Sequence, residues 1–598
     1  MKHKESFDGS AHTPSFDRGS EAHSDEESAY RVKRQYSVRS LYGPMDGEEI
    51  RLHRSKTRST ILDSLLRRVS QQQNRCSVSL ERAIDVEDPH HEDQGEDLVS
   101  IDPELVTWDG PDDPENPRNW KNSERVLQTF IVTVYTFISP VSSSMLSPAM
   151  DDIAKLLDIT NAAVKSLCVS IMVLAWAVGP LVISPISESD GIGRLPVLNL
   201  SIWIVAVFNL ACGFAKTPLQ FCIFRFLGGL GGCTPLNVGA GTLADLWNDE
   251  ERLYALAAYS MGPTFGPVVA PVIGSFIVTG LDWHWCFYIL AIFNFVVAFL
   301  GLIFFKETYA PALLKQKAIR MRKASNNPYL HTLFEIADGD TTWERLATGI
   351  KRPISLLFLH PIVFGLSSFM AFTYGFMYLM IVTFPTVFQG TYGFSTNISG
   401  LMYLVFGAGY LLGIFIWAFV IKKGYSILQK RNNGVGKPEY RLPALCFSGI
   451  GVPIGLVWYG WSAEKKLCWI MPGIGLAIFS FSLIAIFLTI QSYLIEMNNT
   501  FAASSMAASA FFRSLFGFAF PLFATAMYNK LGYGWGNTLC AFIGLGLGIP
   551  FPVFCLMKGE KLRLWANRRF ERKQLLKEQQ KLERLRKKNE KEMSQKEA

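Results

Sequence analysis

Long apolar segments separated by shorter polar connections constrain this chain more than any other feature of its sequence. A helix that crosses the hydrocarbon core of a bilayer needs roughly 20 mostly apolar residues. Only 18% of the 598 residues are charged, whereas a soluble domain carries roughly 25%. The sequence therefore predicts an all-α polytopic membrane protein with twelve transmembrane helices. These segments lie at about residues 126–146, 164–187, 196–214, 219–245, 254–279, 284–305, 354–385, 398–421, 442–461, 467–496, 502–528 and 536–557.

The positions of Lys and Arg predict the orientation of these helices. Nine cationic side chains lie between Lys306 and Arg352, after the sixth segment, and six lie between Lys422 and Arg441, after the eighth. Basic connections are retained on the cytoplasmic side of a membrane, so we expect both termini in the cytoplasm. The expected layout is a cytoplasmic tail at 1–125, a six-helix half at 126–305, a cytoplasmic loop at 306–353, a second six-helix half at 354–557 and a basic cytoplasmic tail at 558–598.

Both tails have compositions that do not build a packed core. Residues 1–125 are rich in Ser and charged side chains, which predicts a disordered segment. Ser37 and Ser70 follow basic residues and are candidate phosphorylation sites, although an unmodified tail is equally compatible with the pattern. Residues 558–598 predict a basic helix beside the lipid headgroups. Because that run adjoins the last apolar segment directly, we expect contact with lipid and no nucleic-acid partner.

The sequence contains no motif that is typical of an enzyme active site. The chain has no phosphate-binding Gly-Lys-Ser/Thr loop and no catalytic triad motif, and its ten cysteines include no C-x-x-C pair. We therefore expect no enzyme activity, no metal and no cofactor other than an ion gradient. A small organic solute and the bilayer are the expected partners, and a monomer is the expected state.

Two arginines fall inside the apolar segments, where a charge is costly and is usually functional. Arg225 lies in the fourth segment among glycines, and Arg513 lies in the eleventh among phenylalanines. Each is a candidate for binding solute or tuning a proton site. The alternative for each is a structural arginine whose guanidinium is satisfied by neighbouring groups.

The two halves of the chain show a weak repeat. The fourth segment ends near Asp245 and the tenth near Glu496, at an offset of about 250 residues that also relates the starts of the following segments. An anion at the carboxyl end of a helix opposes the helix dipole. Asp245 and Glu496 are therefore candidates for salt bridges that gate the pathway, with ordinary solvated helix ends as the alternative.

The connection between the second and third segments contains Glu188, Asp190 and Arg194 with two glycines. A short turn with acids and a base can exchange partners when helices rock, so we interpret it as a gate loop. A polar hairpin turn without such a role is the alternative interpretation.

Small residues and prolines recur at four-residue steps in the fifth segment, which places them on one helix face. Such a face is bent by proline and smooth, and we interpret it as a sliding seam between the two halves. Its members are Gly262, Pro263, Gly266, Pro267, Pro271 and Gly274.

Aromatic side chains crowd the seventh segment. Tyr374 and Tyr378 lie one turn apart and could line a cavity that holds organic cations through cation–π contacts. Phe512, beside Arg513, is a further candidate for that cavity. A packing or membrane-interface role is the alternative for all three.

These stretches together resemble the major facilitator superfamily, and within it the fungal twelve-spanner drug:proton antiporters that include multidrug and polyamine transporters. The resemblance covers about Asp113 to Phe570. This copy departs in having extra residues between Glu188 and Gly193, Ala270 where Gly is usual, and Glu496 where Asp is usual. The stretches that carry it are Asp113–Trp120, Pro185–Glu188 with Gly193–Arg194, Arg225–Gly229, Gly262–Gly274, Glu307–Pro311, Tyr493–Glu496 and Phe511–Trp535.

The resemblance implies alternating access by two rocking halves and proton-driven export of drugs or polyamines, with Arg225 associated with proton transfer. Glu188, Asp245 and Glu496 are the acids we would test for protonation. Uptake of polyamines or other organic cations on the same fold is the main alternative, and a non-transporting receptor is a third. We expect the plasma membrane rather than the vacuole.

Overall fold

The computed structural model describes residues 104–110, 112–187, 192–332, 335, 342–497 and 502–597. Within that part of the chain the regular structure is helical, apart from one isolated parallel bridge between Leu105 and His331. This confirms the predicted all-α class. The candidate phosphorylation sites Ser37 and Ser70, and Glu188 and Asp190 of the predicted gate loop, lie outside the described residues.

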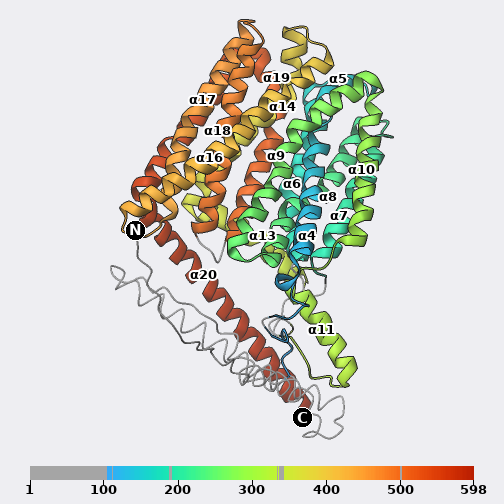
Figure 1. Ribbon diagram of the computed structural model, residues 1–598, viewed down its shortest axis with the longest axis vertical. Coiled ribbons are helices and arrows are strands. Elements are labelled where there is room, and N and C mark those ends of the chain that lie inside the picture. Colours follow the sequence, from blue (N-terminus) through green and yellow to red (C-terminus); the bar gives the residue numbers. More distant parts are fainter. Residues whose placement is uncertain are drawn as a thin grey trace, which may run out of the picture.

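The first half of the chain forms six long helices. Short α5 (Met150–Leu156) follows the first of them and closes one end of the bundle. Figure 1 shows these blue and green helices side by side, with the orange and red helices of the second half beyond them. The six are α4 (Asn122–Ser144), α6 (Ala162–Ser187), α7 (Arg194–Cys212), α8 (Pro218–Leu246), α9 (Asp249–Gly280) and α10 (Trp283–Phe304).

The second half repeats this pattern. Short α15 (Thr396–Leu401) leads into its second long helix. The second half comprises α14 (Pro361–Pro385), α16 (Tyr403–Arg431), α17 (Leu442–Glu464), α18 (Ile470–Met497), α19 (Ala502–Gly548) and α20 (Pro550–Glu597).

Eleven stretches of the described chain are helical, long and apolar enough to cross a membrane, judged by length and composition alone. The last of these, Ser504–Lys577, covers both the eleventh and the twelfth predicted segments. Its backbone leaves the helical region at Gly532, with φ 72° and ψ 175°, a conformation that favours glycine. The Glu464 carboxylate accepts a 2.7 Å hydrogen bond from the Tyr533 N–H beside that break. The two predicted spans therefore lie on either side of Gly532.

The connection between the halves forms α11 (Ala310–Ser325) and α13 (Thr342–Leu359). We call the end of the bundle that carries them the long-loop face, and the end that carries α5 the opposite face. Figure 1 shows α11 and the long red helix α20 projecting from the same end of the bundle. Helix α13 packs on α6, since a Cβ on Gly349 would overlap the ring of Pro185.

A segment before the first long helix packs against α11. This N-terminal strap (residues 104–110 and 112–121) buries Val106 beside Ala318 and Leu330. The Lys317 ammonium, 6% exposed, lies 2.9 Å from carboxylate oxygens of both Asp109 and Asp113. Burial opposes ionisation of Asp113, but hydrogen bonds from the Asp109 and Glu115 amides and from Lys317 outweigh it, so the pKa of Asp113 is lowered. Ordered structure thus starts before the predicted boundary at 125.

The halves meet at the opposite face along one side of α9. A Cβ on Gly407 of α16 would overlap the side chain of Val268, and one on Gly400 of α15 would overlap Ser275. The Thr279 hydroxyl donates a 2.6 Å hydrogen bond to the side-chain oxygen of Asn397. Contact between the halves is therefore close enough here that glycine is required on the second-half side.

Candidate functional site: paired charges at the long-loop face and arginines inside the bundle

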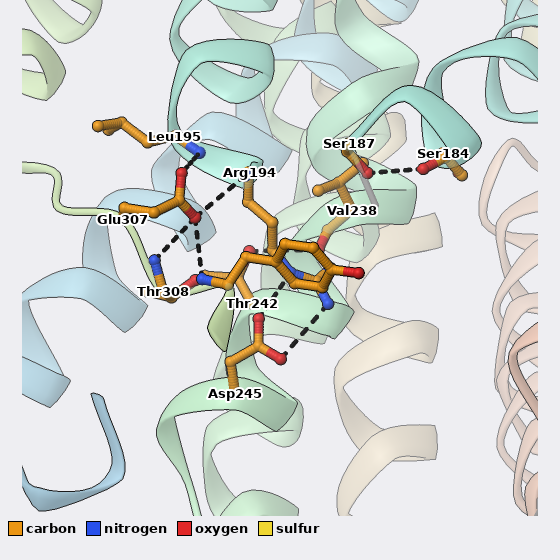
Figure 2. Close-up of polar contacts among 10 residues, drawn as sticks. Ser184, Ser187, Arg194, Leu195, Val238, Thr242, Asp245, Glu307 and Thr308 are labelled. Atoms are coloured by element: carbon orange, nitrogen blue, oxygen red, sulfur yellow. Dashed lines mark hydrogen bonds and ion pairs between the residues drawn. The ribbon is translucent and has the colours of Figure 1, made fainter. Parts of the chain in front are cut away.

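The Arg194 guanidinium at the start of α7 pairs with Asp245 near the end of α8. Arg194 Nε lies 2.6 Å from Asp245 Oδ2, and the two side chains are 9% and 21% exposed. A second arginine nitrogen lies 3.4 Å from the Val238 carbonyl, and the guanidinium covers the Tyr309 ring at 5.2 Å. Figure 2 shows the arginine reaching across the helix ends to the carboxylate. The structure thus supplies Asp245 with a partner, so its carboxylate is more than an ordinary solvated helix end, and its role as a gate stays a prediction.

Glu307 holds the backbone that presents Arg194. Its carboxylate accepts hydrogen bonds from the amides of Arg194 (3.1 Å), Leu195, Thr308 and Tyr309 (2.9 Å each). A carboxylate at the start of α7 stabilises the exposed N–H groups there. Gly193, with φ 80°, leaves room for the carboxylate, since a Cβ at that position would overlap Glu307. In the sequence Glu307 stands out only as the first residue of the Glu307–Pro311 stretch, and its anchoring role was not predicted.

The second half carries a corresponding pair. Arg441, at the start of α17, binds Glu496 at the end of α18 through both its Nε, at 2.8 Å, and one terminal nitrogen. Arg441 stands 247 residues after Arg194, and Glu496 stands 251 residues after Asp245. Arg441 was not predicted as a site residue, although the offset of the internal repeat was a signal that could have found it.

Further ion pairs support that end of the second half. Arg563 of α20 lies 2.8 Å from Glu439, and Lys437 lies 2.8 Å from Glu560. The pKa of Lys437 is raised, chiefly by its hydrogen bond to Glu560. All of these pairs, like Arg194 with Asp245, join segments of the same half. The long-loop face therefore has two separately braced clusters of charge.

Arg225 is satisfied by the backbone of two neighbouring helices. Its guanidinium donates to the carbonyls of Ser142 (2.8 Å) and Ser143 (3.0 Å) on α4, and of Cys168 (3.0 Å) and Val169 (3.3 Å) on α6. The residue is 2% exposed. Four carbonyl acceptors match the structural interpretation of this arginine, because they hold three helices of the first half together.

Arg513 of α19 has different surroundings. Its guanidinium lies 5.1 Å from the ring centre of Tyr374 on α14 and 5.4 Å from that of Phe487 on α18. Among the described residues it makes no hydrogen bond or ion pair, and its buried Nε is without an acceptor. The two interior arginines are thus chemically distinct, one saturated with acceptors and the other lying only on aromatic rings.

The predicted aromatic cavity residues divide into two groups. Tyr374 and Tyr378 have ring centres 5.1 Å apart, and Arg513 already lies over the Tyr374 ring. Phe512 instead packs on Phe516, at 5.0 Å, and on Phe364 at 6.0 Å. Since Phe364 is 41% exposed, Phe512 belongs to the outer seam of α14 and α19.

The glycines of α9 do not form the seam between the halves. A Cβ on Gly262 would stand 3.0 Å from the Thr133 carbonyl oxygen, one on Gly266 would stand 2.6 Å from the Pro140 Cβ, and one on Gly274 would overlap the Met145 carbonyl. All three contacts are with α4 and its end, in the same half. The predicted sliding seam at Gly262, Pro263, Gly266, Pro267, Pro271 and Gly274 is therefore wrong for the glycines. The inter-half side of α9 carries Val268, Pro271, Ser275 and Thr279.

In most of the described membrane-crossing helices, any acidic side chain lies at a helix end. In helices α6 to α10, α14 and α16 to α19, each described Asp or Glu lies in a terminal turn, such as Asp245, Glu464 and Glu496. No group of three metal-ligating side chains occurs among the described residues. The interior cations Arg225 and Arg513 therefore have no acidic counterpart in the interior of these described helices.

Comparison with known proteins identifies the class. The sequence profile of the Major Facilitator Superfamily matches residues 132–521. The efflux pump vrtL of Penicillium aethiopicum is 43% identical over 458 residues, covering 76% of this chain and 90% of that protein. The efflux pump radE of Floropilus chiversii is 37% identical over 463 residues, covering 77% of this chain and 85% of that protein.

The fold agrees with that class. The structure of the xylose transporter XylE from E. coli, in a partially occluded inward-open conformation, superposes with a TM-score of 0.54 at 14% identity, covering 73% of this chain and 97% of that one. The chain belongs to the Major Facilitator Superfamily. It is a multi-pass membrane transporter of small molecules and not an enzyme.

Proposed function

We propose that this transporter exports small organic solutes of the drug or xenobiotic type by alternating access, driven by proton entry. The observation that carries the proposal is the ion pair between Arg194 and Asp245, with Arg441 and Glu496 as its counterpart. Each pair closes within its own half, so the halves can separate at the long-loop face without breaking either. The similarity to two proteins named efflux pumps supports export.

Asp245 is the coupling group in this proposal. Protonation would neutralise its carboxylate and release the Arg194 guanidinium, which is buried enough that the loss of its partner is costly. Proton binding would in this way favour one arrangement of the helix ends, and solute binding the other. Glu496 would act similarly on Arg441. We place the long-loop face in the cytoplasm, where its many basic side chains belong, and the protein in the plasma membrane as a monomer.

Reconstituted transport tests the direction and the coupling. Proteoliposomes with an acidic lumen should accumulate radiolabelled fluconazole or cycloheximide, because protons leaving the lumen would drive antiport inward. Asp245→Asn should abolish the accumulation that the proton gradient drives. The variant should still exchange solute across the membrane when no gradient is imposed. Glu251→Gln removes a carboxylate that is 48% exposed in its pair with Arg125; it is the matched control and should retain coupling. Loss of solute from acidic vesicles together with protons would instead establish symport and overturn the proposal.

A further inference from the structure

Arg513 lies at about the same depth in the bundle as Trp176, a second side chain whose N–H group has no acceptor among the described residues. A Cβ on Gly517 of α19 would stand 3.2 Å from Val173 of α6 and 2.8 Å from Tyr374, so α6 and α19 pack closely at this level. One turn nearer the long-loop face lie Trp176 on α6 and Arg513 on α19. Each is 11 residues from its helix end at that face, Ser187 and Ala502 respectively.

Trp176 and Arg513 each carry a buried N–H donor without an acceptor. The Trp176 ring is 4% exposed, yet its Nε1–H has no acceptor among the described residues, and neither does Arg513 Nε. Buried donors nearly always have an acceptor, because leaving one unpaired costs about 1–3 kcal/mol. The two donors come from different halves of the transporter. Together they present N–H groups, with no carboxylate on the described spans at that depth.

Aromatic rings lie around the Arg513 guanidinium. The rings of Tyr374 and Phe487 lie against the guanidinium. Tyr259 of α9 and Tyr410 of α16 are near enough to interact electrostatically with its charge. The hydroxyls of these last two are already engaged, by the Pro235 carbonyl and by Met377 respectively. The rings therefore offer flat apolar surface, and the acceptor-seeking groups are Arg513 and Trp176.

We propose that Arg513 and Trp176 bind an anionic oxygen of planar aromatic solutes, so that the transported class is aromatic carboxylates, phenolates and enolates. A guanidinium binds such oxygens through charge-assisted hydrogen bonds, and the surrounding rings stack on the solute. A polyamine or other organic cation would meet a positive charge here and no carboxylate. The inference deepens the proposed transport function and rests on it, because it names the solute.

Three probes of one shape test this assignment: 2-naphthoate, 2-naphthol and 2-naphthylmethylammonium. Binding to the full-length purified protein is measured in detergent without a proton gradient, so the result does not depend on coupling or direction. We expect 2-naphthoate to bind at least about 10-fold more tightly than the ammonium probe, as a single charge-assisted hydrogen bond accounts for that factor. Equal or tighter binding of the ammonium would overturn the inference on the wild-type protein alone.

Variants then locate the donors. Arg513→Gln should weaken 2-naphthoate binding by about 10- to 100-fold and change 2-naphthol binding little. Trp176→Phe should weaken both by about 5-fold, because it removes one neutral donor and keeps the ring. Trp417→Phe is the matched control, since the Trp417 indole N–H is also unpaired but its ring packs on Phe481. Unchanged naphthoate affinity in a folded Arg513→Gln protein would refute the site, and Arg513→Lys provides a second variant that retains the charge.

Transport and binding separate the two proposals. If proteoliposomes show no proton-driven transport but the three probes bind in the expected order, the export proposal fails and the site stands. If fluconazole or cycloheximide is transported but 2-naphthoate binds no better than its cationic counterpart, the solute assignment fails and export stands.

Discussion

Arg194 and Asp245 form an ion pair across the long-loop ends of α7 and α8, with 2.6 Å between Nε and Oδ2. Arg441 and Glu496 repeat the arrangement across α17 and α18. The order of the partners is also the same in both halves, with arginine first and carboxylate later in the chain.

Removing the carboxylate of the first pair should be more harmful than exchanging the two charges. Asp245→Asn leaves a guanidinium that is only 9% exposed without its anion, which costs about 3 kcal/mol. We expect a lower melting temperature in detergent and transport reduced by at least about 10-fold. The exchange Arg194→Asp with Asp245→Arg should recover part of both. Wild-type transport by Asp245→Asn would contradict the role assigned to the pair.

Arg225 should matter chiefly for stability. Arg225→Met removes four hydrogen bonds to carbonyls of α4 and α6, and we expect a loss of several kcal/mol, at about 1 kcal/mol or more for each bond. Arg225→Lys should lose less, because an ammonium can still reach some acceptors. Thermal unfolding in detergent measures both. Arg320→Met, which breaks an exposed pair with Glu115, is the control, and an equal effect of the two substitutions would show that Arg225 is not the structural cation described.

The hydrogen bond from Thr279 to Asn397 should favour the conformation in which the two halves are closed at the opposite face. Thr279→Val removes the 2.6 Å contact with Asn397 at the opposite face, along with a 2.8 Å bond from the same hydroxyl to the Ser275 carbonyl inside α9. Loss of the Asn397 contact should shift the equilibrium toward opening there by about 5-fold, the factor for roughly 1 kcal/mol. Distances between spin labels on α9 and α16 measure the shift. Thr264→Val is the control, since that hydroxyl bonds to the Ser260 carbonyl inside α9. Identical distance distributions in all three proteins would remove this contact from the conformational equilibrium.

Acid should loosen the junction between α14 and α20. His360 is 1% exposed, accepts from the Val363 N–H at 3.4 Å through Nδ1, and contacts the Asn567 side-chain oxygen at 3.1 Å through Nε2. Burial lowers the pKa of this imidazole below 6.5, so the folded state favours the neutral ring. Its contribution is therefore complete above pH 6.5 and decreases as the pH falls.

Thermal unfolding measured from pH 7.5 down to pH 5 provides the check, with His360→Gln as the comparison. The wild-type melting temperature should fall more steeply with acid than that of the variant, because glutamine does not titrate. Parallel pH profiles would assign the acid sensitivity to other groups. Protease cleavage near Asn567 should increase over the same pH interval.

Much of the architecture could be predicted from the sequence because the bilayer demands length and apolarity in each crossing segment. The break at Gly532 shows the limit of that approach, since hydropathy locates spans eleven and twelve but not how tightly they join. Asp245 and Glu496 were found because an acid at a helix end is unusual. Their arginine partners come from distant segments, which hydropathy does not connect.

The error at α9 has a similar cause. Four-residue spacing places Gly262, Gly266 and Gly274 on one face, but periodicity does not say which helix that face meets. The contrast between Arg225 and Arg513 was equally inaccessible, because their acceptors are backbone carbonyls and rings of other helices. Whether a buried arginine is saturated depends on tertiary packing alone.

The ion pairs of Asp109 and Asp113 with Lys317 tie the N-terminal strap to α11, in the connection between the two halves. A pull on the strap would therefore load α11 as well as α4, the helix that the strap precedes. The N-terminal strap and the connection between the halves are thus mechanically coupled.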